Sequence, residues 1–255
     1  MIMPTIRASF DRRQAHHLVG LLGRDDPELR EAAQRRLEEE GIDSLLDDPR
    51  VQNALLTDVR SGASSEILAY VLVRQSLLES GIDDRGTADY IATLLLRFGC
   101  GNRAYRISDE TDEEFHYLVD IVMREGEEGG AGAVGGRARG RARGRSGRST
   151  FLLHSHLGNY SLWITGLFPD FLDARVQRRG APALSYYEKL GAAGYRKAAA
   201  TPHAESLRIE EILRGVAEDF SGIRRALNRM ADRYLWPDTG NPVNRLLREV
   251  ADRYR

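Results

Sequence analysis

Two histidines lie in a segment that contains no charged residue. The stretch FLLHSHLGNYSLWITGLFP (151–169) has no Asp, Glu, Lys or Arg, although charged residues make up 29% of the chain. His156 shares a helical face with Leu157 and Tyr160, and a neutral imidazole in apolar surroundings can bind a metal or haem or transfer protons. His156 is therefore the leading candidate ligand and His154 a further one. The more common role of such a histidine is structural, with one ring N–H donated to a core acceptor, and we favour that interpretation.

The two histidines require separate explanations. Each residue of a helix turns by about 100°, so His154 and His156 point roughly 160° apart and cannot share one metal ion. His154 falls on the face of Gly158, Ser161 and Thr165, small residues that permit close approach of a second helix. The sequence therefore predicts a central helix that is surrounded on most sides.

A second histidine has carboxylates at helical spacing. The segment DEEFHYLVD places Glu113 three residues before His116, which is the Glu-x-x-His spacing of di-iron helical bundles. Such bundles need a second Glu-x-x-His, and none of the other five histidines has a glutamate at that position. Glu113 and His116 are thus candidate metal ligands, whereas a carboxylate-paired surface histidine is the favoured interpretation. His16, His17 and His203 are read as surface or helix-cap residues.

One low-complexity segment is rich in glycine and arginine. Residues 126–148 contain six arginines within a short run and too little apolar surface to favour an ordered core. The arginines could neutralise phosphates of RNA or DNA, but no aromatic residue accompanies them for base stacking. We favour a flexible linker over a nucleic-acid site; the candidate residues are Arg137, Arg139, Arg141, Arg143, Arg145 and Arg148.

Other polar residues fall on apolar helices. Arg74 lies in ILAYVLVRQSLL, where burial would require an acidic partner, and Glu66 and Asp89 are the expected ones. Four further residues could edge a pocket, although packing is the more common role: Tyr186, Tyr187, Glu188 and Tyr195.

The elements that carry these residues are all predicted helices. Asp26-Pro27 and Gly41 bracket thirteen strong helix formers, and Asp48-Pro49 begins the next helix in the same way. The sum is an all-α fold, an irregular multi-helix bundle of about ten to twelve helices with a flexible Gly/Arg-rich loop. The paired starts GRDDPELREAA and LDDPRVQNALL resemble the helix starts of HEAT-type repeats, which implies a HEAT-like array at the N-terminus as an alternative.

Charge divides the chain into three parts. Residues 1–125 form an acidic helical half of net charge −9, the linker 126–148 carries +4, and the helical half 149–255 carries +4. Because opposite charges attract, we expect the two halves to pack together as one domain.

Composition limits the classes of function. The single cysteine, Cys100, fits a reducing compartment, and neither a secretory signal nor a membrane span is expected, so we predict a cytoplasmic protein. Complete catalytic motifs are absent. We therefore expect a non-catalytic interaction or regulatory protein with a protein partner or self-association. The alternatives are a metal- or haem-dependent enzyme centred on His156 and weak nucleic-acid binding through 137–148; the sequence identifies no cofactor.

Overall fold

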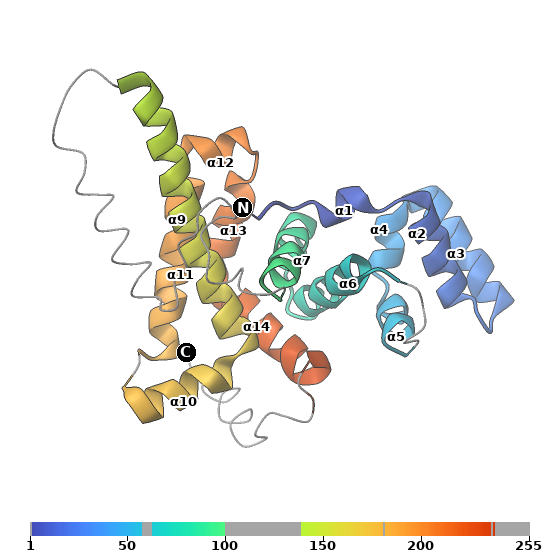
Figure 1. The fold of residues 1–255 in the computed structure, drawn as a ribbon. Helices are drawn as coiled ribbons and strands as arrows, with labels where there is room; N and C mark the ends of the chain where they lie inside the picture. The colour runs from blue at the N-terminus through green and yellow to red at the C-terminus, as the bar shows by residue number, and fades with distance from the viewer. Residues whose placement is uncertain (1, 58–62, 100–138, 181, 236, 238–255) are drawn as a thin grey trace. The chain divides into compact units, whose positions relative to one another are not determined.

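The computed structural model describes residues 2–57, 63–99, 139–180, 182–235 and 237. Within these ranges the chain forms thirteen α-helices and a short π-helical turn, and it forms no strand (Figure 1). The predicted all-α multi-helix bundle is confirmed. The helices expected around 111–125 and after Asn241 lie outside the described residues.

The chain divides into two compact units. Residues Ile2–Leu96 form the N-terminal unit, and the described residues from Arg97 onward form the C-terminal unit. The end of the acidic half, expected at residue 125, lies outside the described ranges. The expectation that the halves 1–125 and 149–255 pack as one domain stays a prediction.

Helix caps account for the elements of the N-terminal unit. Asp26 begins α3 by accepting a hydrogen bond from the Leu29 backbone N–H at 3.0 Å, and Gly41 ends it with a φ of 83°, as the sequence predicts. Ser64 caps α6 in the same way. The helices are α1 (Ile6–Ser9), α2 (Arg12–Leu22), α3 (Pro27–Glu40), α4 (Ile42–Leu46), α5 (Pro49–Thr57), α6 (Ser65–Leu78) and α7 (Arg85–Gly99), whose last residues fall in the other unit.

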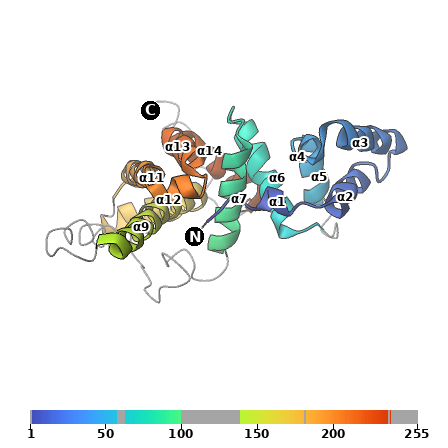
Figure 2. The ribbon, with the colours of Figure 1, turned by 90° about the horizontal axis from the view of Figure 1, so that it is seen from above.

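Helices α2 and α3 lie side by side (Figures 1 and 2). Gly23 permits this approach, because a Cβ at that position would lie only 2.1 Å from the Cβ of Arg30.

The C-terminal unit is built on one long helix. Helix α9 begins at Arg139, ten residues before the predicted start of the C-terminal half, and ends at Leu167. Five arginines favour this helical extension into the segment predicted to be a linker, whereas its three glycines oppose it. The remaining elements are α10 (Pro169–Arg179), α11 (Leu184–Ala199), α12 (Pro202–Ser206), α13 (Glu210–Glu218), α14 (Phe220–Met230) and the π-helical turn η3 (Ala231–Leu235).

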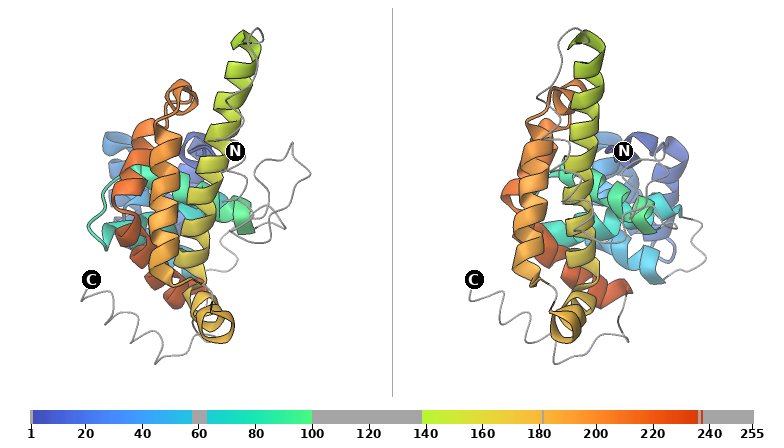
Figure 3. Two further views of the ribbon diagram at one scale, coloured as in Figure 1. Left: turned by 90° about the vertical axis from the view of Figure 1, so that its left-hand side faces the viewer. Right: turned by 60° about the vertical axis from the view of Figure 1, so that its left-hand side comes forward.

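Helix α11 packs along α9 through glycines on both helices (Figure 3). A Cβ at Gly194 would lie 2.9 Å from the His154 carbonyl oxygen and 3.0 Å from the Gly158 nitrogen. Gly158 itself faces the ring of Tyr195. The small-residue face predicted for α9 is thus the face on which a second helix approaches.

Candidate functional site

The histidines of α9 lie in the core of the C-terminal unit. The exposed fraction is 8% for His154 and 3% for His156. The ring of His156 lies 5.7 Å from that of Phe98 and 6.5 Å from that of Tyr160, so aromatic rings form much of its surroundings. This environment is the apolar one that the sequence indicates.

The structure brings no metal-binding set together within the described ranges. There, no group of three or more His, Cys, Asp or Glu side chains is placed to hold a metal ion. Glu113 and His116 lie outside these ranges. A metal role for His116, Glu113, His154 or His156 therefore stays a prediction.

A buried polar network joins three helices of the same unit. Arg224 of α14 has an exposed fraction of 1% and donates from Nε to the Glu188 carboxylate of α11 at 2.9 Å. Its Nη1 donates to Asn228 Oδ1 at 2.9 Å. The Asn228 amide in turn donates to the carbonyls of Thr165 and Gly166 at 2.8 and 2.7 Å. These carbonyls belong to the last turn of α9, where no intrahelical donor remains, so the network caps that helix.

Three of the four residues that could edge a pocket serve in packing. Tyr195 donates its hydroxyl to Asn159 Oδ1 at 2.8 Å inside the core, and Glu188 is the partner of Arg224. Tyr187 is buried, and that burial raises the pKa of its hydroxyl. Only Tyr186 is largely exposed, at 45%.

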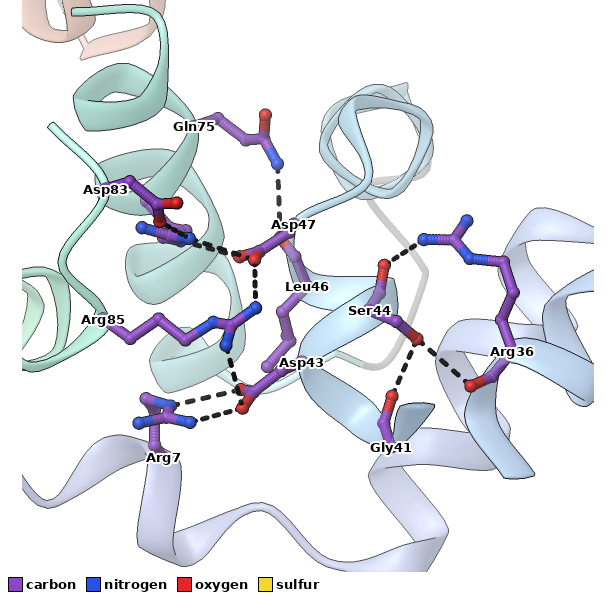
Figure 4. Close-up of polar contacts among 11 residues, drawn as sticks. Arg7, Arg36, Gly41, Asp43, Ser44, Leu46, Asp47, Gln75, Asp83 and Arg85 are labelled. Atoms are coloured by element: carbon purple, nitrogen blue, oxygen red, sulfur yellow. Dashed lines mark hydrogen bonds and ion pairs between the residues drawn. The ribbon is translucent and has the colours of Figure 1, made fainter. Parts of the chain in front are cut away.

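The N-terminal unit contains a chain of alternating charges (Figure 4). Arg7 pairs with Asp43 at 2.5 Å, Arg85 pairs with Asp47 at 2.7 Å, and Asp47 also accepts from Arg74 at 2.7 Å. The chain continues from Arg74 to Asp83 at 2.5 Å and ties α1, α4, α6 and the start of α7 together.

The acidic partners predicted for Arg74 are wrong. Arg74 pairs with Asp47 and Asp83 instead of Glu66 or Asp89. Glu66 lies two helical turns away along α6, beyond reach. Asp89 accepts hydrogen bonds from the backbone N–H groups of Ile6 and Arg7, and its burial raises its pKa despite them.

Among the carboxylates of the described residues, Asp48 has the most strongly lowered pKa. Burial raises the pKa of Asp48, but hydrogen bonds from Arg50 and Arg36 outweigh this effect and bring it to about 2, from an ordinary 3.8. A pKa that is lower in the folded chain means that the carboxylate stabilises the fold above about pH 4. This contribution, roughly 2 kcal/mol, is lost as the pH falls from about 4 towards 2.

We therefore expect Asp48→Asn to lower the free energy of unfolding by about 2 kcal/mol at pH 6, and by progressively less below pH 4. Urea unfolding followed by circular dichroism at several pH values measures the difference from wild type. Asp25→Asn, at an exposed position in the same unit, is the control. A difference that stays constant down to pH 2.5 contradicts the assignment.

Helices α10 and α11 together expose two aromatic rings. Phe171 is 51% exposed, and the Arg175 guanidinium lies over its ring, 5.6 Å from the centroid. The charge of Arg175 also acts on Tyr187, whose ring lies 5.8 Å from that of Tyr186. We call Phe171, Arg175 and Tyr186 the aromatic–arginine surface. Phe171 and Arg175 are not among the residues predicted from the sequence, although an aromatic residue four positions before an arginine is the spacing that brings such side chains together on a helix.

The arginines proposed for nucleic-acid binding are only partly described. Arg137 lies outside the described residues. Helix α9 includes the other five, and the side chain of Arg148 is exposed; the remaining four are Arg139, Arg141, Arg143 and Arg145. Nucleic-acid binding through this segment stays a prediction.

Comparisons of the chain with protein-family models, curated proteins and solved structures found no match. The HEAT-like alternative for the N-terminus accordingly stays a prediction. Among the described helices, none is both long enough and apolar enough to span a membrane.

Proposed function

We propose that the protein is a non-catalytic interaction protein, and that the aromatic–arginine surface binds an acidic segment of a partner protein. The observation that carries this proposal is the exposure of Phe171 and Tyr186 on two consecutive helices. The Arg175 guanidinium lies over the Phe171 ring, and its charge also acts on Tyr187, the neighbour of Tyr186. Aromatic residues and arginine are enriched at protein interfaces, and tyrosine and arginine are enriched among the few residues that carry most of the binding energy.

Charge favours an acidic partner. Residues 169–199, which span α10 and α11, carry a net charge of +3, and the buried Arg224 already neutralises one of their three carboxylates, Glu188. A partner segment with carboxylates beside apolar side chains would match both features of the surface.

A protein fits this surface better than a nucleic acid. Arg175 is the one cation among the three residues of the surface, whereas binding to a nucleic-acid backbone relies on several cations that neutralise phosphates. We also propose a cytoplasmic location, supported by the single cysteine, Cys100, in a chain of 255 residues.

Photocrosslinking from position 186 tests this function. The full chain, with benzoylphenylalanine in place of Tyr186, is irradiated in its host cell, and the crosslinked protein and peptide are identified by mass spectrometry. Purified partner is then titrated against variants of the chain. We expect Phe171→Ala and Arg175→Gln each to weaken binding about tenfold, the effect of losing a central interface side chain.

Arg196→Gln provides the matched control, because Arg196 is an exposed cation on the same helix as Tyr186 but outside the surface. It should change the affinity less than twofold. Crosslinks only to nucleic acid or to a second copy of the chain would overturn the proposal, as would a partner whose affinity is unchanged by both surface variants.

A further inference from the structure

The N-terminal unit has a separate pocket between α2 and α3, two helices that lie side by side (Figure 2). Its volume is about 410 Å³, which is within the range of small-molecule sites. Six residues line it: His16, Val19, Arg30, Glu31, Gln34 and Arg35. We propose that this pocket binds a small organic anion through Arg30 and Arg35.

The charges of the two pocket arginines are not neutralised by an ion pair with a described residue. Neither Arg30 nor Arg35 forms an ion pair with any residue that the structure describes. Glu31 stands four residues before Arg35, the usual spacing for a helical ion pair, yet no such pair forms. Five arginines elsewhere in this unit do pair with aspartates: Arg7, Arg36, Arg50, Arg74 and Arg85.

The pocket, rather than the lack of an ion pair, distinguishes Arg30 and Arg35. Arg12 and Arg13 of α2 also form no ion pair with a described residue, but they do not line the pocket. There, an arginine can present a planar pair of N–H donors to a phosphate or carboxylate that lies between α2 and α3.

The other lining residues define the class of ligand. Val19 is 3% exposed and offers an apolar contact, while His16 adds a ring nitrogen that can donate a hydrogen bond. Gln34 already donates to Glu38 at 2.6 Å, which leaves the arginines as the main donors. The set suits an organic anion with a phosphate or paired carboxylates at one end and a small apolar part.

An NMR titration of the ¹⁵N-labelled full chain tests the site. The probes are pyrophosphate, for phosphate chemistry, and citrate, for carboxylate chemistry. We expect saturable shifts of the backbone amides in α2 and α3 with at least one probe. Arg30→Gln combined with Arg35→Gln should weaken binding at least tenfold, whereas Arg12→Gln combined with Arg13→Gln should change it less than twofold.

Each outcome bears on the proposal. Saturation by only one probe supports the site and assigns the ligand to that anion class. Equal losses in the two double variants, shifts spread over all arginine-bearing helices, or the absence of saturation with both probes would overturn it. The four arginines are exposed, so we expect their substitution to leave the fold intact. A well-dispersed spectrum of each variant verifies this. The site is independent of the aromatic–arginine surface, so failure of one proposal leaves the other standing.

Discussion

Replacing Arg224 with methionine is expected to lower the free energy of unfolding of the C-terminal unit by about 3–5 kcal/mol. Arg224 is 1% exposed, and its loss removes the cation that lies 2.9 Å from the Glu188 carboxylate, which is itself only 12% exposed. The Oδ1 of Asn228 loses a donor at the same time. Methionine retains much of the aliphatic volume, so the measured cost reports the charge and the hydrogen bonds more than an empty space.

Urea unfolding followed by tryptophan fluorescence measures this loss, because both tryptophans, Trp163 and Trp236, come after residue 97. Glu188→Leu combined with Arg224→Met is the informative control. The double variant removes both charges, and we expect it to be more stable than Arg224→Met alone, since the buried carboxylate that loses Arg224 is removed as well. A cost below 1 kcal/mol for Arg224→Met, or a double variant with two additive losses, would contradict a buried ion pair.

Local signals of the sequence predict the helices well. Asp26 and Pro27 mark the start of α3, and Gly41 marks its end. Capping depends on backbone groups only a few residues away, so these helix ends can be predicted from the local sequence. The close approach of α11 to α9 is also foreseeable in part, because helical periodicity alone gathers Gly158, Ser161 and Thr165 on one face. Periodicity does not reveal the partner of that face, which is an α11 glycine, Gly194.

Long-range pairs are the part that the sequence does not determine. Arg224 and Glu188 are 36 residues apart, and Arg74 is 27 residues from Asp47. Any of the chain's 38 acidic residues could in principle neutralise a buried arginine, so the choice depends on how the helices pack. The same reasoning applies to the aromatic–arginine surface, because exposure of Phe171 is a property of the packed unit and has no signature in the local sequence.

The N-terminal unit offers a second test of how much a buried arginine in an ion pair stabilises the fold. Arg74→Met is expected to lower the free energy of unfolding of this unit by about 3 kcal/mol. Arg74 is 1% exposed and holds both oxygens of Asp47, at 2.7 and 3.0 Å, and Asp83 at 2.5 Å. The cost falls at the low end for a buried pair because Asp83 is 76% exposed and can be solvated again. Arg85 also remains beside Asp47 in the variant.

Arg85→Met is the matched control, because Arg85 binds the same carboxylate at 2.7 Å but is 43% exposed. Solvent screening limits such a pair to less than about 1 kcal/mol. Hydrogen exchange of the α6 amides, read by mass spectrometry, should therefore accelerate about a hundredfold in Arg74→Met and less than about fivefold in Arg85→Met. Equal effects of the two substitutions would mean that burial does not govern this network. A larger effect for Arg85 would assign the main contact of Asp47 to the exposed arginine.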